Sequence, residues 1–242
     1  MVPRLVVPQD CNRSGSVGRA ADALANQHNP ELGAIVLEAL APTLADRVLE
    51  VGFGSGALLA DLAGRADFVG GVDRSATMID CARKRFAAAI AQGRMELREG
   101  RAEALPFGAR SFDKACTVNT IYFWQSLEAG FDELGRVLRP RGRLVVGFLP
   151  KEPMARLNLP ANVFALREPA EVLAALARTG FADAAIVPVA VRTGWCVAVA
   201  SAPTAMRAQT ASPVAEPREK RLLAANRWRT SPLLEDLALQ QT

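Results

Sequence analysis

Three glycines at alternate positions follow a short run of apolar residues in the first quarter of the chain. The stretch reads Val48-Leu-Glu-Val-Gly-Phe-Gly-Ser-Gly56, and a second apolar run ends 17 positions later at Asp73, in Gly-Val-Asp. Glycine carries no Cβ, so its backbone can turn sharply and approach a ligand closely. A carboxylate at the end of the next strand can accept hydrogen bonds from both hydroxyls of a ribose. The pattern therefore predicts a strand–turn–helix site for a cofactor that contains adenosine.

Length and composition favour one α/β domain with a large core. The chain has 242 residues, of which 50% are hydrophobic. Its 29 basic and 25 acidic residues give a modest net charge of +4. The basic residues are spread along the chain instead of forming a stripe, so we expect no nucleic-acid partner.

The cysteines and the apolar runs exclude two further classes of protein. Cys11, Cys81, Cys116 and Cys196 are far apart and form no CxxC pair, so we expect no metal site. The start, Met-Val-Pro-Arg-Leu, lacks the long apolar stretch of a secretory signal. No apolar run reaches the roughly 18 residues of a membrane span. We expect a soluble, cytoplasmic protein.

Apolar periodicity and turn residues predict strands that alternate with helices. The expected strands cover 47–51, 68–72, 95–98, 112–118, 143–149, 185–191 and 195–200. The expected helices cover 31–41, 57–63, 75–91, 127–138 and 169–179. Alternation of this kind predicts a doubly wound, mostly parallel α/β sheet of seven strands. The final two strands are joined by too short a link for a helical crossover, so the last strand should be antiparallel.

The pattern also divides the chain into segments. Residues 1–30 are polar and are expected to form an N-terminal cap segment, and 31–202 form the cofactor-binding domain. Within that domain the apolar stretch 150–168 is expected to be a lid over the substrate. Residues 203–242 contain four prolines and read as a flexible tail. An alternative for this tail is a docking segment for a protein partner or for a second copy of the chain.

Two cofactors are compatible with the glycine run. Gly52-x-Gly54-x-x-Ala57 satisfies the loose fingerprint of a nicotinamide dinucleotide site. S-adenosylmethionine (SAM) uses a wider turn that holds the amino-acid end of the cofactor. Glu50 lies in the strand that leads into the turn, where its charge would repel a pyrophosphate. The same charge suits a cofactor that carries a sulfonium and an ammonium group.

Five motifs in order make the chain resemble the class I SAM-dependent methyltransferases, over roughly residues 31–200. The branch it resembles includes the ubiquinone- and menaquinone-type enzymes that act on small molecules. The motifs are Glu-Val-Gly-Phe-Gly-Ser-Gly (50–56), Gly-Val-Asp-Arg-Ser (71–75), Arg-Ala-Glu-Ala-Leu-Pro-Phe (101–107), Ser-Phe-Asp-Lys-Ala-Cys (111–116) and Leu-Gly-Arg-Val-Leu-Arg-Pro-Arg-Gly-Arg-Leu (134–144). The resemblance implies the Rossmann-like methyltransferase fold and SAM as the cofactor.

The resemblance also implies roles at the cofactor. The three glycines would line the methionine moiety, Glu50 would reach the ammonium group, and Asp73 would bind the ribose. The implied cofactor-binding residues are Glu50, Gly52, Gly54, Gly56, Asp73, Arg74, Met78, Ala102, Glu103 and Asn119.

Residues further along the chain have implied roles around the adenine and the sulfur. Arg74 and Met78 would flank the adenine, and Ala102 and Glu103 would lie at its edge. Asn119, just past the fourth strand, would meet the methionine part or the substrate.

One departure concerns the adenine edge. The family often has Asp where this chain has Arg101, and arginine cannot accept a hydrogen bond. The adenine amino group would then need a backbone acceptor or Glu103.

The acceptor side of the site contains few bases. Methyl transfer from SAM needs mainly alignment of the acceptor and exclusion of water. His28 is the only histidine and is a candidate base if the N-terminal segment covers the site. Tyr122 is a second candidate, and with Phe123 and Trp124 it is expected to form an aromatic wall for a flat or apolar acceptor. The alternative for these aromatic residues is packing beneath the neighbouring helix.

Three functions remain open from the sequence. The first is methyl transfer from SAM to the oxygen, nitrogen or carbon of a small organic acceptor. Asn119-Thr-Ile-Tyr122 lacks the prolines of the Asn-Pro-Pro-Tyr motif of nucleic-acid amine methyltransferases, which argues against a nucleic-acid acceptor. The second is an NAD-dependent oxidoreductase, and the third is a non-catalytic SAM-binding scaffold or regulatory protein.

Overall fold

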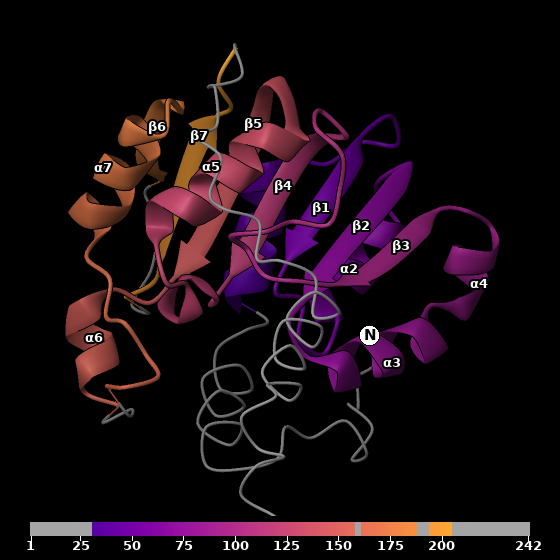
Figure 1. Cartoon of the computed structure of the whole chain (residues 1–242), viewed down its shortest axis with the longest axis horizontal. Helices are drawn as coiled ribbons and strands as arrows, with labels where there is room; N and C mark the ends of the chain where they lie inside the picture. Colours follow the sequence, from indigo (N-terminus) through magenta and orange to yellow (C-terminus); the bar gives the residue numbers. More distant parts are fainter. Residues whose placement is uncertain (1–30, 158–160, 188–193, 205–242) are drawn as a thin grey trace, which may run out of the picture. The chain divides into compact units, whose positions relative to one another are not determined.

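The computed structural model describes residues 31–157, 161–187 and 194–204, and this part of the chain forms a seven-stranded sheet with helices around it (Figure 1). The strands are β1 (Arg47–Val51), β2 (Phe68–Asp73), β3 (Met95–Glu99), β4 (Phe112–Val118), β5 (Leu138–Phe148), β6 (Ala182–Val187) and β7 (Cys196–Ser201). Their order in the sheet is β3-β2-β1-β4-β5-β7-β6. Strands β1–β5 are parallel, and β7 is antiparallel to both β5 and β6. The expected doubly wound α/β fold is confirmed.

The helices cover the two halves of the sheet. They are the helix over residues 31–40, then α2 (Ala57–Ala63), α3 (Ala76–Arg85), α4 (Ala87–Ala91), α5 (Leu127–Val137), α6 (Lys151–Ala155) and α7 (Pro169–Arg178), with a 3-10 turn, η2, at Ile121–Phe123. α2 and α3 pack against β1–β3, whereas α5 and α7 pack against each other and against β5–β7. Ser75 and Ser126 begin α3 and α5 by accepting a hydrogen bond from a backbone N–H of the first turn.

The position of β1 determines where a ligand can bind. β1 pairs with β2 on one side and with β4 on the other, so the order of the strands reverses at this point. Loops that leave the carboxyl ends of the two strands separate there and leave space for a ligand. β1 itself is buried from Val48 to Val51, as expected for a parallel strand covered by helices. A ligand site is therefore expected at the residues that follow Val51 and Val118, the last residues of β1 and β4.

Four elements differ from the sequence expectation. The sixth strand begins at Ala182 instead of 185, and residues 188–191 of its expected range lie outside the described residues. The short helix α6 within the expected lid was not predicted. The helix expected over 75–91 is divided at Phe86, whose φ of −103° and ψ of 19° depart from helical geometry. The fifth strand begins at Leu138 instead of 143, because residues 139–142 bulge out between the paired positions of β4 and β5. Pro140 has no N–H to donate, and Arg141 has a φ of 63°, so neither continues the ladder.

The stretch expected to be a lid packs against the segment after β4. Phe164 is buried, and the N–H of Ala165 donates a hydrogen bond to the carbonyl of Tyr122 at 2.9 Å. The expected cap segment 1–30, nearly all of the tail 203–242 and three lid residues, 158–160, lie outside the described residues. Within the described ranges no helix is long and apolar enough to cross a membrane.

Two helical glycines provide a matched test of packing. A Cβ at Gly130 in α5 would overlap the indole ring of Trp124, whereas a Cβ at Gly33 would meet nothing within 4 Å. We expect Gly130→Ala to lower the free energy of unfolding by about 1–3 kcal/mol through overpacking. Gly33→Ala should raise it by up to about 1 kcal/mol, since alanine favours the helix. Urea unfolding of both variants checks this, and equal effects would contradict the described contact between α5 and Trp124.

Candidate functional site

The glycine run forms a left-handed loop directly after β1. Gly52, Gly54 and Gly56 have φ values of 76°, 53° and 71°. Side chains with a Cβ rarely adopt this region, which explains why the sequence has glycine at all three positions. The N–H of Gly52 donates to the carbonyl of Val72 at 2.7 Å and joins the loop to β2. The loop therefore presents backbone, without side chains, at the carboxyl edge of the sheet.

Asp73, the last residue of β2, holds the loop in place. Its Oδ2 accepts a hydrogen bond from the N–H of Gly54 at 2.8 Å, and its Oδ1 accepts one from the N–H of Ser75 at 2.9 Å. The side chain is 3% exposed. Each carboxylate oxygen has two acceptor sites, so both retain capacity for a ligand hydroxyl. Asp73 thus links β2, the glycine loop and the start of α3.

Further side chains fix the loop from β4 and α3. Thr117 donates a hydrogen bond from Oγ1 to the carbonyl of Val51 at 2.9 Å, and it also contacts the hydroxyl of Thr120. A Cβ at Gly52 would overlap the methyl group of Thr120. Arg85 donates from Nη1 to the carbonyl of Ser55 at 3.0 Å. These contacts leave little freedom in the loop.

The carboxyl group of Glu50 is buried beside this loop. The residue is 4% exposed, and its Oε2 has no hydrogen-bond partner among the described residues. Burial, followed by the nearby charges of Asp73 and Asp61, raises the pKa of Glu50 from 4.5 to about 8. A buried carboxyl group without a partner is energetically unfavourable. Its position on β1 makes it a candidate to receive a cationic group.

Asn119 and Tyr122 form a polar corner at the end of β4. Asn119 is 8% exposed and adopts a φ of 55°. The hydroxyl of Tyr122 donates to Oδ1 of Asn119 at 3.0 Å, and it accepts a hydrogen bond from the N–H of Leu149 at 2.5 Å. Tyr122 is 1% exposed, and burial raises the pKa of its phenol well above the usual value. This geometry suits Tyr122 to positioning Asn119 and makes it a poor proton acceptor.

The three aromatic residues have different surroundings. The ring of Phe123 is half-buried, with the Phe164 ring centroid at 4.9 Å and the Arg74 guanidinium carbon at 5.9 Å from its centroid. Trp124 is buried and packs edge-on against Phe131 of α5 at 5.4 Å. Trp124 therefore packs beneath the neighbouring helix, which was the alternative to an aromatic wall. Phe123 instead lies between Arg74, at the end of β2, and Phe164 of the 150–168 stretch.

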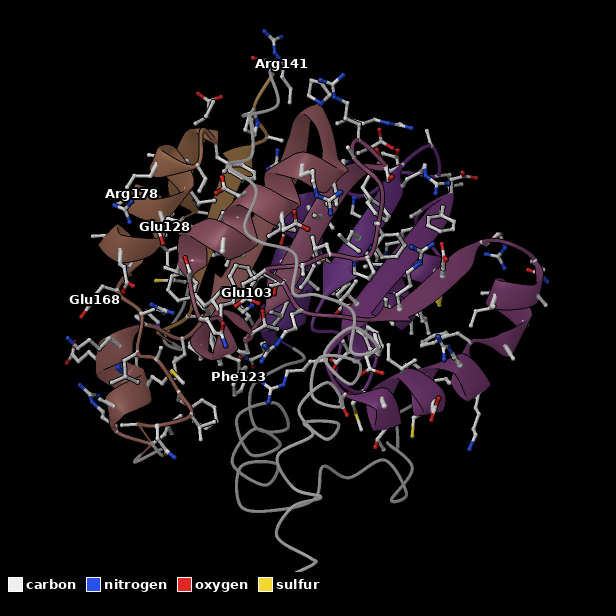
Figure 2. All side chains as sticks on the ribbon, viewed as in Figure 1. Glu103, Phe123, Glu128, Arg141, Glu168 and Arg178 are labelled. Atoms are coloured by element: carbon white, nitrogen blue, oxygen red, sulfur yellow. The ribbon has the colours of Figure 1, made fainter. Side chains whose placement is uncertain are left out.

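The remaining predicted cofactor residues lie around the same edge. Met78 and Ala102 are buried, and Arg74 is exposed. Glu103 accepts a hydrogen bond from the N–H of Gln125 at 2.7 Å, which connects the loop after β3 to the loop after β4. Figure 2 shows Glu103 and Phe123 well away from Arg141, which lies at the other end of the sheet. His28 lies outside the described residues.

Some site residues were not found from the sequence. Thr117 is hydrogen-bonded to Val51, just before the glycine loop, and Thr120 packs against Gly52. The hydroxyl of Thr117 among apolar neighbours in β4 was the sequence feature that could have indicated its role. Arg167 donates to the carbonyls of Ile121 and Trp124 at 3.4 and 3.1 Å and so holds both ends of η2. A contact of this kind between segments more than 40 positions apart leaves no local pattern in the sequence.

A hollow at the opposite, amino end of the sheet is unsuited to the predicted cofactor. It has a volume of ≈ 490 Å³ and is lined by residues before β1 and at the starts of β4 and β5. Its Lys114 pairs with Asp46 at 2.9 Å, and its Arg139 pairs with Asp113 at 2.5 Å. The positive charges of Lys114 and Arg139 are therefore already paired with carboxylates of the protein. The described residues contain no cluster of three potential metal ligands, at this end or the other.

Comparison with known proteins links the matched region to one family. Residues 49–146 match the family described as "Methyltransferase domain". This range begins within β1 and ends within β5, so it includes the glycine loop, Asp73 and Asn119.

Curated relatives and solved structures agree with this match. An O-methyltransferase of Pyrenophora dematioidea is 32% identical over 115 residues, which cover 47% of this chain and 43% of the relative. A demethylmenaquinone methyltransferase of Clavibacter sepedonicus is 34% identical over 108 residues, which cover 45% and 43%. The chain thus spans less than half the length of these two relatives. A SAM-dependent methyltransferase from Aquifex aeolicus shares the fold, with a TM-score of 0.61, 19% identity and coverage of 76% and 97%.

The close approach of Thr120 to the loop gives a testable stability difference. Gly52→Ala adds a Cβ both at positive φ and against the Thr120 methyl group, whereas Gly93→Ala adds one at a φ of 68° in open space. We expect Gly93→Ala to lower the free energy of unfolding by about 1–2 kcal/mol. Gly52→Ala should lower it by about 1–3 kcal/mol more, because of the overlap. Thermal and urea unfolding measure both effects.

The double variant Gly52→Ala/Thr120→Ser provides the control, since serine keeps the hydroxyl and removes the overlapping methyl group. It should recover part of the difference between the two single variants. No recovery would contradict the packing of Thr120 on the loop.

Burial of Glu50 predicts a pH-dependent stability. Its folded pKa of about 8 lies above the ordinary 4.5, so its proton is bound more tightly in the folded state. The destabilisation is absent below about pH 4.5 and grows as pH rises to about 8, by up to about 1.4 kcal/mol per unit. We expect Glu50→Gln to be more stable than wild type at pH 8 and equally stable near pH 4.5. Urea unfolding across this range measures the difference.

Glu38→Gln is the control, since it removes an exposed carboxylate of the helix over 31–40. This variant should retain the wild-type loss of stability between pH 5 and 8. A Glu50→Gln curve parallel to wild type would contradict the described burial.

Proposed function

Since residues 49–146 match the family described as "Methyltransferase domain", we propose that the chain transfers a methyl group from SAM to a small organic acceptor. The observation that carries this proposal is the buried carboxyl group of Glu50, whose Oε2 lacks a partner, beside a side-chain-free loop of three glycines. A dinucleotide would bring the negative charge of a pyrophosphate next to Asp73 and Asp61, whose charges already oppose ionisation of Glu50. SAM would bring an ammonium group.

The residues present fit the proposed cofactor. The ammonium group would pair with Glu50, the ribose hydroxyls with Asp73, and the methionine part would lie along Gly52, Gly54 and Gly56. The left-handed glycines allow the close backbone approach that such a ligand needs. Arg74, Met78, Ala102 and Glu103 are proposed for the adenine side. Asn119 is proposed for the methionine part or the acceptor.

The chemistry proposed here asks little of the protein beyond positioning. SAM supplies a methyl carbon already activated by the sulfonium, so the protein must align the acceptor and exclude water. The hydrogen bonds of Asp73 and Thr117 would hold the loop, and those of Tyr122 would hold Asn119. Phe123 and Phe164 would shield the reacting region from solvent. If the acceptor needs a base, His28 remains the candidate.

The acceptor class is proposed from the apolar character of the acceptor side. The rings of Phe123 and Phe164 are in contact, and the segment after β5 adds buried Met154. One relative is named an O-methyltransferase and another a demethylmenaquinone methyltransferase, which supports a small organic acceptor. We propose no nucleic-acid acceptor, because Asn119-Thr-Ile-Tyr122 lacks both prolines of the Asn-Pro-Pro-Tyr motif.

Binding of S-adenosylhomocysteine (SAH), the demethylated cofactor, tests the proposal through Asp73. Asp73→Asn cannot accept hydrogen bonds with both side-chain atoms, so one loop contact and one ribose contact are lost. We expect the dissociation constant for SAH to rise at least about tenfold, which corresponds to about 1.4 kcal/mol. Isothermal titration calorimetry measures this change, and urea unfolding of the free variant confirms that it is folded.

Asp67→Asn is the matched control, because Asp67 is an exposed aspartate that precedes the first residue of β2, at the end of the strand opposite Asp73. It should bind SAH as wild type does. Unchanged binding by Asp73→Asn, or NADH binding in place of SAH, would overturn the proposal. Methyl transfer itself is tested by incubating the protein with methyl-labelled SAM and a panel of phenols, quinols and amines.

A further inference from the structure

The carboxyl group of Glu50 has an environment that differs from that of Asp73, although both lie at the glycine loop. Asp73 accepts hydrogen bonds from two backbone N–H groups, whereas Oε2 of Glu50 is buried without a partner. On β1, Glu50 is in register with Gly71 of β2 and with Cys116 of β4. Neither neighbour brings a cation. Glu50 is therefore a buried acid that no described group neutralises.

The charged and titratable groups around Glu50 come from four elements. β2 contributes Asp73 and α2 contributes Asp61, and both negative charges oppose ionisation of Glu50. β4 contributes Cys116, a fully buried thiol whose pKa is raised by burial and by Glu50. α3 contributes Arg85, whose guanidinium donates to the carbonyl of Ser55 and interacts with Asp61. Burial first, and then the charges of Asp73 and Asp61, raise the pKa of Glu50 to about 8.

We propose that Glu50 is a protonated acid in the free protein and gives up its proton when a ligand's ammonium group binds beside the glycine loop. This inference rests on the proposed function and adds a proton to the binding equilibrium. The O–H bond of the carboxyl group breaks, its electron pair stays on the carboxylate, and the proton passes to solvent. The ammonium group keeps its own protons and donates a hydrogen bond to the oxygen that lacks a partner. The carboxylate of Glu50 and the ammonium group of the ligand then form a neutral pair.

The linkage makes affinity depend on pH in a defined direction. Below pH 8 most free protein carries the proton, so binding must include its release, and affinity falls as pH falls. With a pKa of about 8, affinity for SAH should be roughly 50-fold lower at pH 6 than at pH 8. Above pH 8 the dependence on Glu50 should level off. The site would thus bind its cofactor more tightly as pH rises through the neutral range.

Calorimetry counts the released proton directly. SAH is titrated into the full chain at pH 7 in phosphate and in Tris, two buffers with different ionisation enthalpies. The difference in observed heat gives the number of protons released, which should be about 0.9 per site at pH 7 and about 0.5 at pH 8. Glu50→Gln, which cannot lose a proton, should release close to none and should show weaker, pH-independent binding over pH 6–8.

A second ligand separates the ammonium group from the rest of the cofactor. 5′-Methylthioadenosine has the adenosine and the sulfur but no ammonium group, so it should bind without proton release. Equal release with both ligands, or equal release in Glu50→Gln and wild type, would overturn the assignment to Glu50. SAH binding without any release in wild type would also overturn it while leaving the proposed function intact. Absence of SAH binding would overturn the proposed function, and the linkage with it.

Discussion

The carboxylate of Asp73 is the contact on which the rest of the site depends. With one oxygen on the N–H of Gly54 and the other on the N–H of Ser75, it joins the end of β2 to the glycine loop and to the start of α3. The parallel order β2-β1-β4 brings these segments together, and Thr117 adds the support from β4. A loop of three left-handed glycines would be free to adopt many conformations without such ties. The fold therefore supplies a rigid, side-chain-free surface at the point where the strand order reverses.

Against this rigid frame, Glu50 is the residue that works against stability. A carboxyl group buried without a partner lowers the free energy of unfolding, and an apolar side chain would fit the interior of β1 better. Violations of this kind are expected at functional sites, where the unfavourable group is neutralised by a ligand. Asp73 is thus satisfied by the fold and shapes the loop, whereas Glu50 is the group that we propose is neutralised by the positive charge of a ligand.

Much of the fold could be predicted from the sequence because its signals are local. The strands at 47–51 and 112–118 and the helix at 57–63 agree with the periodicity, and the mostly parallel, doubly wound class of the sheet follows from the alternation of elements. The break at Phe86 could not be predicted, since it accompanies packing of that ring 3.1 Å from the Cβ position of Gly56, 30 residues away. The bulge before β5 depends likewise on pairing with β4.

The candidate site was predicted in part for the same reason. The glycines, Glu50 and Asp73 lie in two short motifs, and the structure brings them to one edge of the sheet. The surroundings of Trp124 were left open by the sequence, and they depend on the space that Gly130 leaves in α5. The clamp by Arg167 on η2 is formed across more than 40 positions and has no motif. Hydrogen bonds from a side chain to backbone groups far away in the sequence could thus not be predicted from the sequence.

A crystal structure of the full chain with SAH would locate the ammonium group relative to Glu50. We expect the ammonium nitrogen at hydrogen-bond distance, about 3 Å, from Oε2 of Glu50, with the ribose hydroxyls on Asp73 and the amino-acid part along Gly52–Gly56. SAH bound elsewhere, or bound at the loop with Glu50 still without a partner, would contradict this expectation.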